Sequence, residues 1–150
     1  MGAEFNQAKT NQAQPIRLLL VEDEFLISEM VAEDLSEQGF IVCAVANGSD
    51  ALSHLASADV DILFTDVNLP GGMDGMMLAR RAREMKPDLP VVYASGHVNA
   101  FDLERCVPGS IFIAKPYMPS LIGRILTSAM EGSPTRDSTR TIARLPATAA

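Results

Sequence analysis

An apolar run that ends in a carboxylate constrains the fold of this chain most. Residues 62–65 read Ile-Leu-Phe-Thr, Asp66 follows at once, and the turn-rich sequence Asn-Leu-Pro-Gly-Gly occupies 68–72. Such a run is too short for a helix, and its branched and aromatic residues predict a buried strand. Asp66 then lies at the carboxyl end of the strand, where an open parallel sheet forms its ligand crevice. The competing interpretation is that Asp66 only caps the following helix.

Strand and helix patterns alternate along the rest of the chain. Four more apolar runs predict strands, at 16–21, 40–45, 89–94 and 111–114. Amphipathic segments lie between these strands and after the last one; the first is closed by Gly39, and the last covers residues 121–129. Five strands that alternate with helical segments predict an α/β fold with a parallel sheet and right-handed crossovers.

The segment after the Asp66 strand predicts a helix with a defined start and end. Asp74 can cap a helix from Gly75 to Met85, which Pro87 ends. On this helix we expect Met77, Leu78 and Ala82 to point inward and Arg80, Arg81 and Arg83 to point outward. By contrast, residues 98–107 form only a weak, short helical segment, which Pro108 and Gly109 stop.

Polar and charged residues follow the expected strands where each strand ends. In a parallel sheet one edge would carry five of them, Glu22, Asp23, Asp66, Ser95 and Lys115. Singly, each has a plainer interpretation as a solvated residue or as an acid at a helix N-terminus. Their joint placement at successive strand ends favours a common site.

Three carboxylates at one edge repel each other and raise each other's apparent pKa. A hard divalent cation resolves this conflict, because Mg²⁺ prefers a few carboxylates together with waters and a phosphate oxygen. Asp66 is then suited to attack a phosphoryl group and form an acyl phosphate. Lys115 can supply a second positive charge, and Ser95 a hydroxyl donor to a phosphoryl oxygen.

This set of motifs resembles the receiver domain of two-component response regulators over residues 16–130. The sequence Val-Glu-Asp-Glu at 21–24 resembles its acidic motif, Asp66 its phosphoacceptor, Ser95-Gly96 its hydroxyl switch and Lys115-Pro116 its lysine motif. The resemblance implies a flavodoxin-like, doubly wound five-stranded parallel sheet of strand order 2-1-3-4-5. The fourth helix would be short or irregular, as in stand-alone receivers of alphaproteobacterial type.

The resemblance also assigns roles to single residues. Mg²⁺ would be held by Glu22, Asp23, Asp66 and the backbone carbonyl of Asn68. Asp66 would accept a phosphoryl group from a histidine kinase or a histidine phosphotransfer protein, and Ser95 and Lys115 would contact that group. The resemblance further implies a cis peptide bond between Lys115 and Pro116, a bond type that costs little before proline.

Three positions would switch or tune the site by the same resemblance. Phe112 occupies the aromatic switch position, whose rotamer follows phosphorylation in many members, although a core strand residue is the alternative interpretation. Asn68 and His97 would tune the lifetime of the acyl phosphate. A His97 lying over the site would make that lifetime sensitive to pH near neutrality. The alternative is an ordinary loop histidine.

Length and composition indicate one domain. The chain has 150 residues, 47% of them hydrophobic, which suits a single core at 16–130. The polar residues 1–15 predict a disordered leader, and the Ser, Thr, Pro and Arg of 131–150 a flexible tail. A tail of about twenty residues is too short for an output domain, so we expect a single-domain regulator that signals or relays by protein contact.

Charge and hydropathy limit the expected partners. A net charge of −7 opposes nucleic-acid binding, which needs a basic surface. The sequence shows no apolar stretch of about 18 residues and no export signal, which indicates no membrane segment and a cytoplasmic location. An unknown downstream protein is the expected target, and a second copy of the chain is a further candidate partner.

Two other functions remain open on the sequence alone. One is a receiver-like binding module that acts without phosphorylation. The other is a Mg²⁺-dependent phosphohydrolase with an aspartyl-phosphate intermediate, but such enzymes carry a second Asp as general acid, and Asp66-Val67-Asn68 lacks it. We therefore expect a phosphoacceptor and not an enzyme, with at most self-phosphorylation from small donors and autodephosphorylation.

Overall fold

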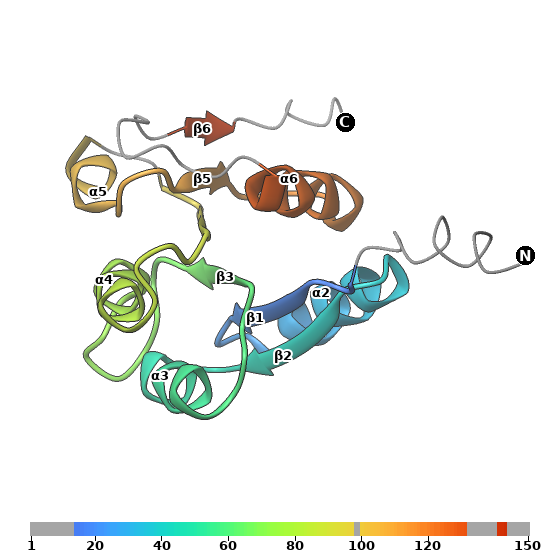
Figure 1. Cartoon of the computed structure of the whole chain (residues 1–150). Helices are drawn as coiled ribbons and strands as arrows, with labels where there is room; N and C mark the ends of the chain where they lie inside the picture. The colour runs from blue at the N-terminus through green and yellow to red at the C-terminus, as the bar shows by residue number, and fades with distance from the viewer. Residues whose placement is uncertain (1–13, 98–99, 132–140, 144–150) are drawn as a thin grey trace, which may run out of the picture.

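A parallel sheet forms the centre of the computed structural model, which describes residues 14–97, 100–131 and 141–143. Its strand order is β2-β1-β3-β4-β5-β6. The strands are β1 (Arg17–Val21), β2 (Ile41–Val45), β3 (Ile62–Asp66), β4 (Val91–Ser95), β5 (Ile111–Ala114) and β6 (Thr141–Ala143). The first five follow the predicted order 2-1-3-4-5, so the predicted flavodoxin-like fold is confirmed (Figure 1).

Helices cover both faces of the sheet. They are α2 (Phe25–Glu37), α3 (Gly48–Ser57), α4 (Gly75–Met85), α5 (Ala100–Arg105) and α6 (Pro119–Glu131). One apolar cluster joins the sheet to α2 and α6, and a second joins it to α3, α4 and α5. Figure 1 shows α2 and α6 on one side of the strands and α3, α4 and α5 on the other. The sheet is therefore doubly wound. None of the helices in the described ranges is long and apolar enough to cross a membrane.

The strand β3 is buried on both faces. All five of its residues are buried, Leu63 within the cluster on the α3 and α4 side and Phe64 within the cluster on the α2 and α6 side. Burial of one such side chain contributes about 1.5–3 kcal/mol, so β3 is firmly held. Its last residue, Asp66, thereby has a fixed backbone position at the edge of the sheet.

The connection from β3 to α4 is tight. Asp74 caps α4 as predicted, because its Oδ1 accepts a hydrogen bond from Met77 N at 2.8 Å. Gly75 N donates to Val67 O at 2.7 Å, which brings the start of α4 against the end of β3. A side chain at position 75 would overlap the carbonyl oxygen of Asp66. Only glycine allows this approach.

Two of the inward and outward assignments on α4 were wrong. Met77 is 36% exposed, and its neighbour Met76 is buried instead. Arg83 is half-buried, and its Nε donates to Leu89 O at 2.6 Å. With Asp74 as the cap, residues three and four apart place Met76, Ala79 and Arg83 along one face, so Arg83 lies at the border of the core.

The region between β4 and β5 is short and irregular, as expected. The helix α5 has six residues and ends before the turn at Pro108 and Gly109. The position after it is fixed by a side chain of the sheet, because Val107 N donates to the buried hydroxyl of Tyr93 at 3.1 Å. Residues 98 and 99, the start of the predicted helical segment, lie outside the described residues.

The sixth strand was not predicted. We expected a flexible tail from residue 131, but Glu131 ends α6, and residues 141–143 pair in parallel with β5 at the edge of the sheet. A run of three residues is too short to show strand periodicity in the sequence. The leader at 1–13 and the rest of the tail lie outside the described residues.

The close approach at Gly75 predicts a strong effect of a single methyl group. We expect Gly75→Ala to lower the free energy of unfolding by about 2 kcal/mol, because the new Cβ meets rigid backbone at Asp66. Urea denaturation followed by circular dichroism would measure it. Gly96→Ala is the control, because a Cβ there meets nothing within 4 Å. Equal effects of the two substitutions would contradict this account.

Candidate phosphoacceptor and metal site

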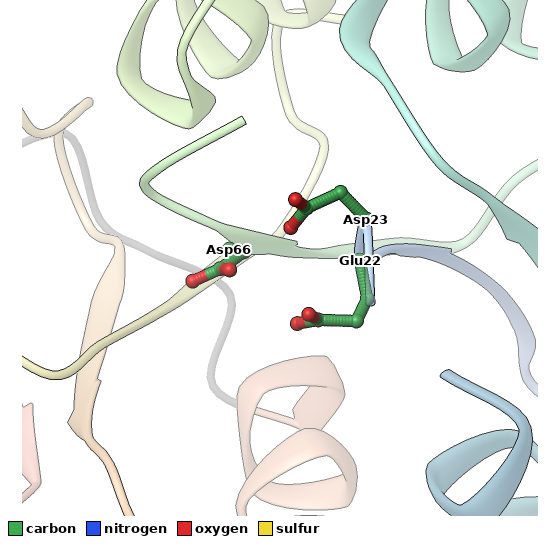
Figure 2. Close-up of side chains that lie close together, drawn as sticks. All are labelled: Glu22, Asp23 and Asp66. Atoms are coloured by element: carbon green, nitrogen blue, oxygen red, sulfur yellow. The ribbon is translucent and has the colours of Figure 1, made fainter. Parts of the chain in front are cut away.

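Three acidic side chains meet at the carboxyl edge of the sheet. Glu22 and Asp23 directly follow β1, and Asp66 ends β3. The three can each offer a carboxylate oxygen such that these atoms all lie within 4.8 Å of one another, and Figure 2 shows the side chains converging on one space. The sequence placed these residues at one edge; the structure brings their carboxylates together.

Backbone pairing explains why these acids converge. The strands β1 and β3 pair in parallel, with Val21 opposite Thr65, so the residues that follow are neighbours. Glu22 N also donates to Val45 O at 3.1 Å, which continues the pairing with β2 beyond the strand. Glu22 is 4% exposed and Asp66 is 9% exposed, whereas Asp23 faces solvent. The pocket therefore has two buried carboxylates and one exposed carboxylate.

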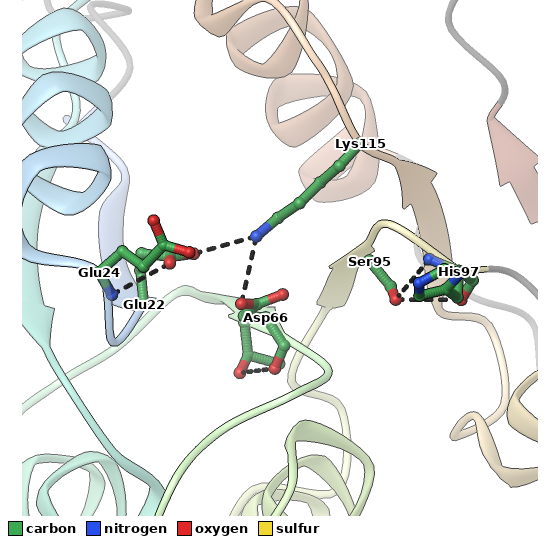
Figure 3. A network of polar contacts seen from close by, with 7 residues as sticks. Glu22, Glu24, Asp66, Ser95, His97 and Lys115 are labelled. Carbon is green, nitrogen blue, oxygen red and sulfur yellow. Dashed lines mark hydrogen bonds and ion pairs between the residues drawn. The ribbon is translucent and has the colours of Figure 1, made fainter.

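Lys115 supplies the positive charge in this pocket. Its Nζ lies 3.2 Å from Asp66 Oδ2 and 3.4 Å from Glu22 Oε2 (Figure 3). Lys115 N donates to Ser95 O at 2.9 Å, which ties the end of β5 to the end of β4. The Lys115–Pro116 peptide bond is cis, as the resemblance implied. The ammonium group thus bridges the two buried carboxylates.

Burial and mutual repulsion shift the pKa values of the charged groups in the pocket. Burial raises the pKa of both Glu22 and Asp66, and negative charge adds to the effect, from Asp66 on Glu22 and from Asp23 on Asp66. Lys115 opposes both shifts. Burial lowers the pKa of Lys115, but the two carboxylates outweigh this and raise it overall. The pocket holds more negative charge than its one ammonium balances.

This donor set fits a hard divalent cation. Carboxylate oxygens are the ligands that Mg²⁺ prefers, and Mg²⁺ keeps waters and phosphate oxygens in its remaining positions. The raised pKa of Glu22 and Asp66 points the same way, since a bound cation would stabilise their charged forms. The acidic pocket is thus suited to hold a cation beside Asp66.

Ser95 does not face this pocket with its hydroxyl. Its Oγ donates to His97 O at 3.0 Å and accepts from His97 N at 3.1 Å, and Figure 3 shows this pair apart from Lys115 and Asp66. The hydroxyl is thus committed to a local turn, although Ser95 itself ends β4 and is buried. His97 is exposed, as is Asn68, two residues after Asp66.

One aromatic residue lies before Lys115 in the core and another lies beside the pocket. Phe112 is 2% exposed, and its ring centroid lies 6.1 Å from that of Tyr93, its register neighbour on β4. Tyr117 was missed in the sequence analysis. Burial raises its pKa, with added contributions from the charges of Glu22 and Asp66, and its ring packs against Phe64. Its only sequence signal is an aromatic residue two positions after Lys115.

The fold and this site define a flavodoxin-like α/β domain with a pocket of three carboxylates and one lysine at the carboxyl edge of its sheet. A family model for the response regulator receiver domain matches residues 18–127. The chain therefore belongs to the response regulator receiver family, which is a signalling family of two-component systems.

Individual relatives agree with this assignment. The chain is 33% identical over 113 residues to the sensor histidine kinase RcsC of Escherichia coli, covering 73% of this chain but only 12% of RcsC. It is 36% identical over 80 residues to the response regulator receiver protein CpdR of Brucella abortus, covering 53% of this chain and 66% of CpdR. A receiver protein structure from Sinorhizobium medicae aligns with a TM-score of 0.75 and 30% identity, over 80% of this chain and 98% of that one.

The raised pKa of the buried acids predicts how stability depends on pH without metal. The folded state keeps protons that the unfolded chain has already lost, so stability falls as pH rises above about 4. We expect Asp66→Asn to be more stable than the wild type at pH 7 in Mg²⁺-free buffer, by about 1 kcal/mol, and the gain to shrink towards pH 4.

Urea denaturation at pH 4, 5.5 and 7 with EDTA would measure this dependence. Glu33→Gln is the control, because Glu33 is exposed on α2 and lies outside the pocket. A gain for Asp66→Asn that is the same at every pH would show that charge repulsion is not its cause.

Proposed function

We propose that this chain is a response regulator receiver that accepts a phosphoryl group on Asp66 and signals or relays by protein contact. A histidine kinase or histidine phosphotransfer protein would be the donor. The observation that carries the proposal is the contact of Lys115 with Asp66 at 3.2 Å, within a pocket that also holds Glu22 and Asp23. In this proposal Asp66 is the nucleophile, Lys115 supplies the positive charge, and the neighbouring acids bind the cation.

The phosphoryl transfer follows from the chemistry of these groups. A carboxylate oxygen of Asp66 forms the new bond to phosphorus as the nitrogen–phosphorus bond of the donor phosphohistidine breaks, and the imidazole leaves with the electron pair and takes up a proton. Lys115 can move its ammonium contact from the carboxylate to a phosphoryl oxygen. Ser95 can donate to another oxygen once its hydroxyl leaves His97.

The cation would be held by Glu22, Asp23, Asp66 and the backbone carbonyl of Asn68. When bound, Mg²⁺ supplies positive charge that offsets the charge of the phosphoryl oxygens and of the carboxylates. Asn68 and His97 are exposed and follow Asp66 and Ser95 by two residues each, and they would tune the access of water to the acyl phosphate. In this proposal the rotamer of Phe112 changes when Asp66 is phosphorylated, and its ring contact with Tyr93 changes with it.

An apolar surface beside the pocket supports docking of a protein donor. Three large side chains at the start of α2 are exposed, Phe25 at 70%, Leu26 at 79% and Met30 at 56%. Met30 also lines a pocket of about 340 Å³ together with Lys115 and Tyr117. Exposed apolar patches mark interaction sites, and this one fits the apolar face of a partner helix. A docked donor would lie next to Asp66.

Phosphorylation of Asp66 can be measured directly. Incubation with Mg²⁺ and acetyl phosphate should add about 80 Da, one phosphoryl group, by intact mass. We expect no gain for Asp66→Asn or without Mg²⁺, and a normal gain for the control Asp88→Asn. No gain for the wild type, under conditions that label a known receiver, would favour a binding module that acts without phosphorylation.

The role of the α2 surface can be separated from the chemistry. We expect Leu26→Ser to slow transfer from a phosphorylated kinase that labels the wild type by about tenfold, because one buried side chain contributes at least 1.5 kcal/mol. Labelling by acetyl phosphate should be unchanged. Met85→Ser is the control, because Met85 is exposed at 43% on α4. Equal slowing by both donors would place the defect in the site and not in docking.

A further inference from the structure

A groove between α4 and the connection from α5 to β5 gathers arginine side chains. Its volume is about 340 Å³, and its lining residues are Arg80, Arg83, Pro87, Glu104, Arg105, Cys106, Val107 and Pro108. It lies at the carboxyl-terminal half of α4, whereas Gly75, beside Asp66, begins that helix. None of these lining residues belongs to the acidic pocket. The chain has a net charge of −7, so three arginines around one groove stand out.

Arg83 carries a positive charge that the protein only partly compensates. Its Nε donates to Leu89 O, but its Nη2 is buried and, within the described part of the chain, is the one buried side-chain nitrogen or oxygen without a hydrogen-bond partner. Burial lowers the pKa of this guanidinium, and the nearby Tyr93 and Asp88 offset the shift only in part. A buried donor without a partner is costly and calls for an explanation.

Arg80 presents a second guanidinium to the same groove. It lies three residues before Arg83 and therefore on the same face of α4. It is exposed and makes no ion pair within the described residues. Arg105 borders the groove as well, but Asp74 holds its Nη2 at 2.7 Å. Glu104 is the one acidic residue in the lining, and Asp88 lies near Arg83, so Arg80 and Arg83 are the two guanidinium groups of the groove that no ion pair in the described residues holds.

We propose that this groove binds a small phosphate-type oxyanion, inorganic phosphate or a phosphate monoester, between Arg80 and Arg83. The planar guanidinium fork matches the oxygens of such an anion, and two negative charges match the two arginines. A negative charge beside the Arg83 guanidinium compensates for the hydration that this group loses on burial. This stabilisation does not require a hydrogen bond from the buried Nη2 atom. The site is independent of Asp66, so it stands or falls separately from the proposed phosphoacceptor function.

Titration of the unphosphorylated full chain with inorganic phosphate, without Mg²⁺ and at constant ionic strength, would test this site. Amide shifts in ¹H–¹⁵N NMR spectra should saturate and centre on residues 80–83 and 103–107. We expect Arg80→Met and Arg83→Met each to weaken binding about fivefold or more, because hydrogen bonds to charged groups are lost. Arg81→Met is the matched control, an exposed arginine of α4 outside the groove.

Further arms distinguish the sources of the anion and keep the test decisive. Glycerol 3-phosphate reports on a monoester, and acetate should bind at least fivefold more weakly than phosphate. Arg83→Lys keeps the charge and replaces Arg83→Met if that variant fails to fold. Shifts that do not saturate, shifts centred on Lys115, or equal losses for Arg80→Met and Arg81→Met would each overturn the proposal.

Discussion

The ammonium group of Lys115 lies between two buried carboxylates that would otherwise repel each other. Asp66 and Glu22 both contact Nζ, at 3.2 and 3.4 Å, and burial raises the pKa of each acid. A buried charge is tolerated only when it is paired, so this contact makes the rest of the pocket possible. It also connects the carboxyl ends of β1, β3 and β5 through side chains alone.

The surrounding fold supplies rigid positions for these charges. The buried strand β3 fixes Asp66, the extension of β1 by the Glu22 to Val45 hydrogen bond fixes Glu22, and the bond from Lys115 N to Ser95 O fixes the end of β5. Gly75 then closes α4 onto the back of Asp66. The anchors at Glu22, Lys115 and Gly75 are backbone contacts, and that of Asp66 is the burial of its strand, which leaves the charged side chains as the parts that can respond to a cation or a phosphoryl group.

The sequence predicted the features that depend on strand ends and helix caps. Apolar runs located β3 and the polar residue after it, and Asp74 marked the start of α4 as the structure has it. The patterns did not fix the rotation of α4, because Met76 and Met77 are equally apolar and only packing decides which is buried. The hydroxyl of Ser95 depends on one rotamer and on the backbone of His97, which no periodicity encodes.

Similar limits explain the other differences. Arg83 reads as a surface residue in the sequence, and its partial burial follows from the position of Leu89 after the turn. The strand β6 forms because its backbone pairs with the open edge of β5. This pairing is a tertiary contact, and a segment of three residues is too short to predict it from sequence periodicity. The roles of the metal ligands came from the resemblance, because spacing alone does not identify which ion a carboxylate cluster binds.

The shortness of α5 has a consequence for cooperativity. A helix of six residues holds few internal hydrogen bonds, and its nucleation is unfavourable on its own. Its position depends instead on contacts such as the bond from Val107 N to the hydroxyl of Tyr93, a residue of β4 that also packs on Phe112. We therefore expect α5 to open more readily than the sheet and the longer helices, because few contacts of its own hold it in place.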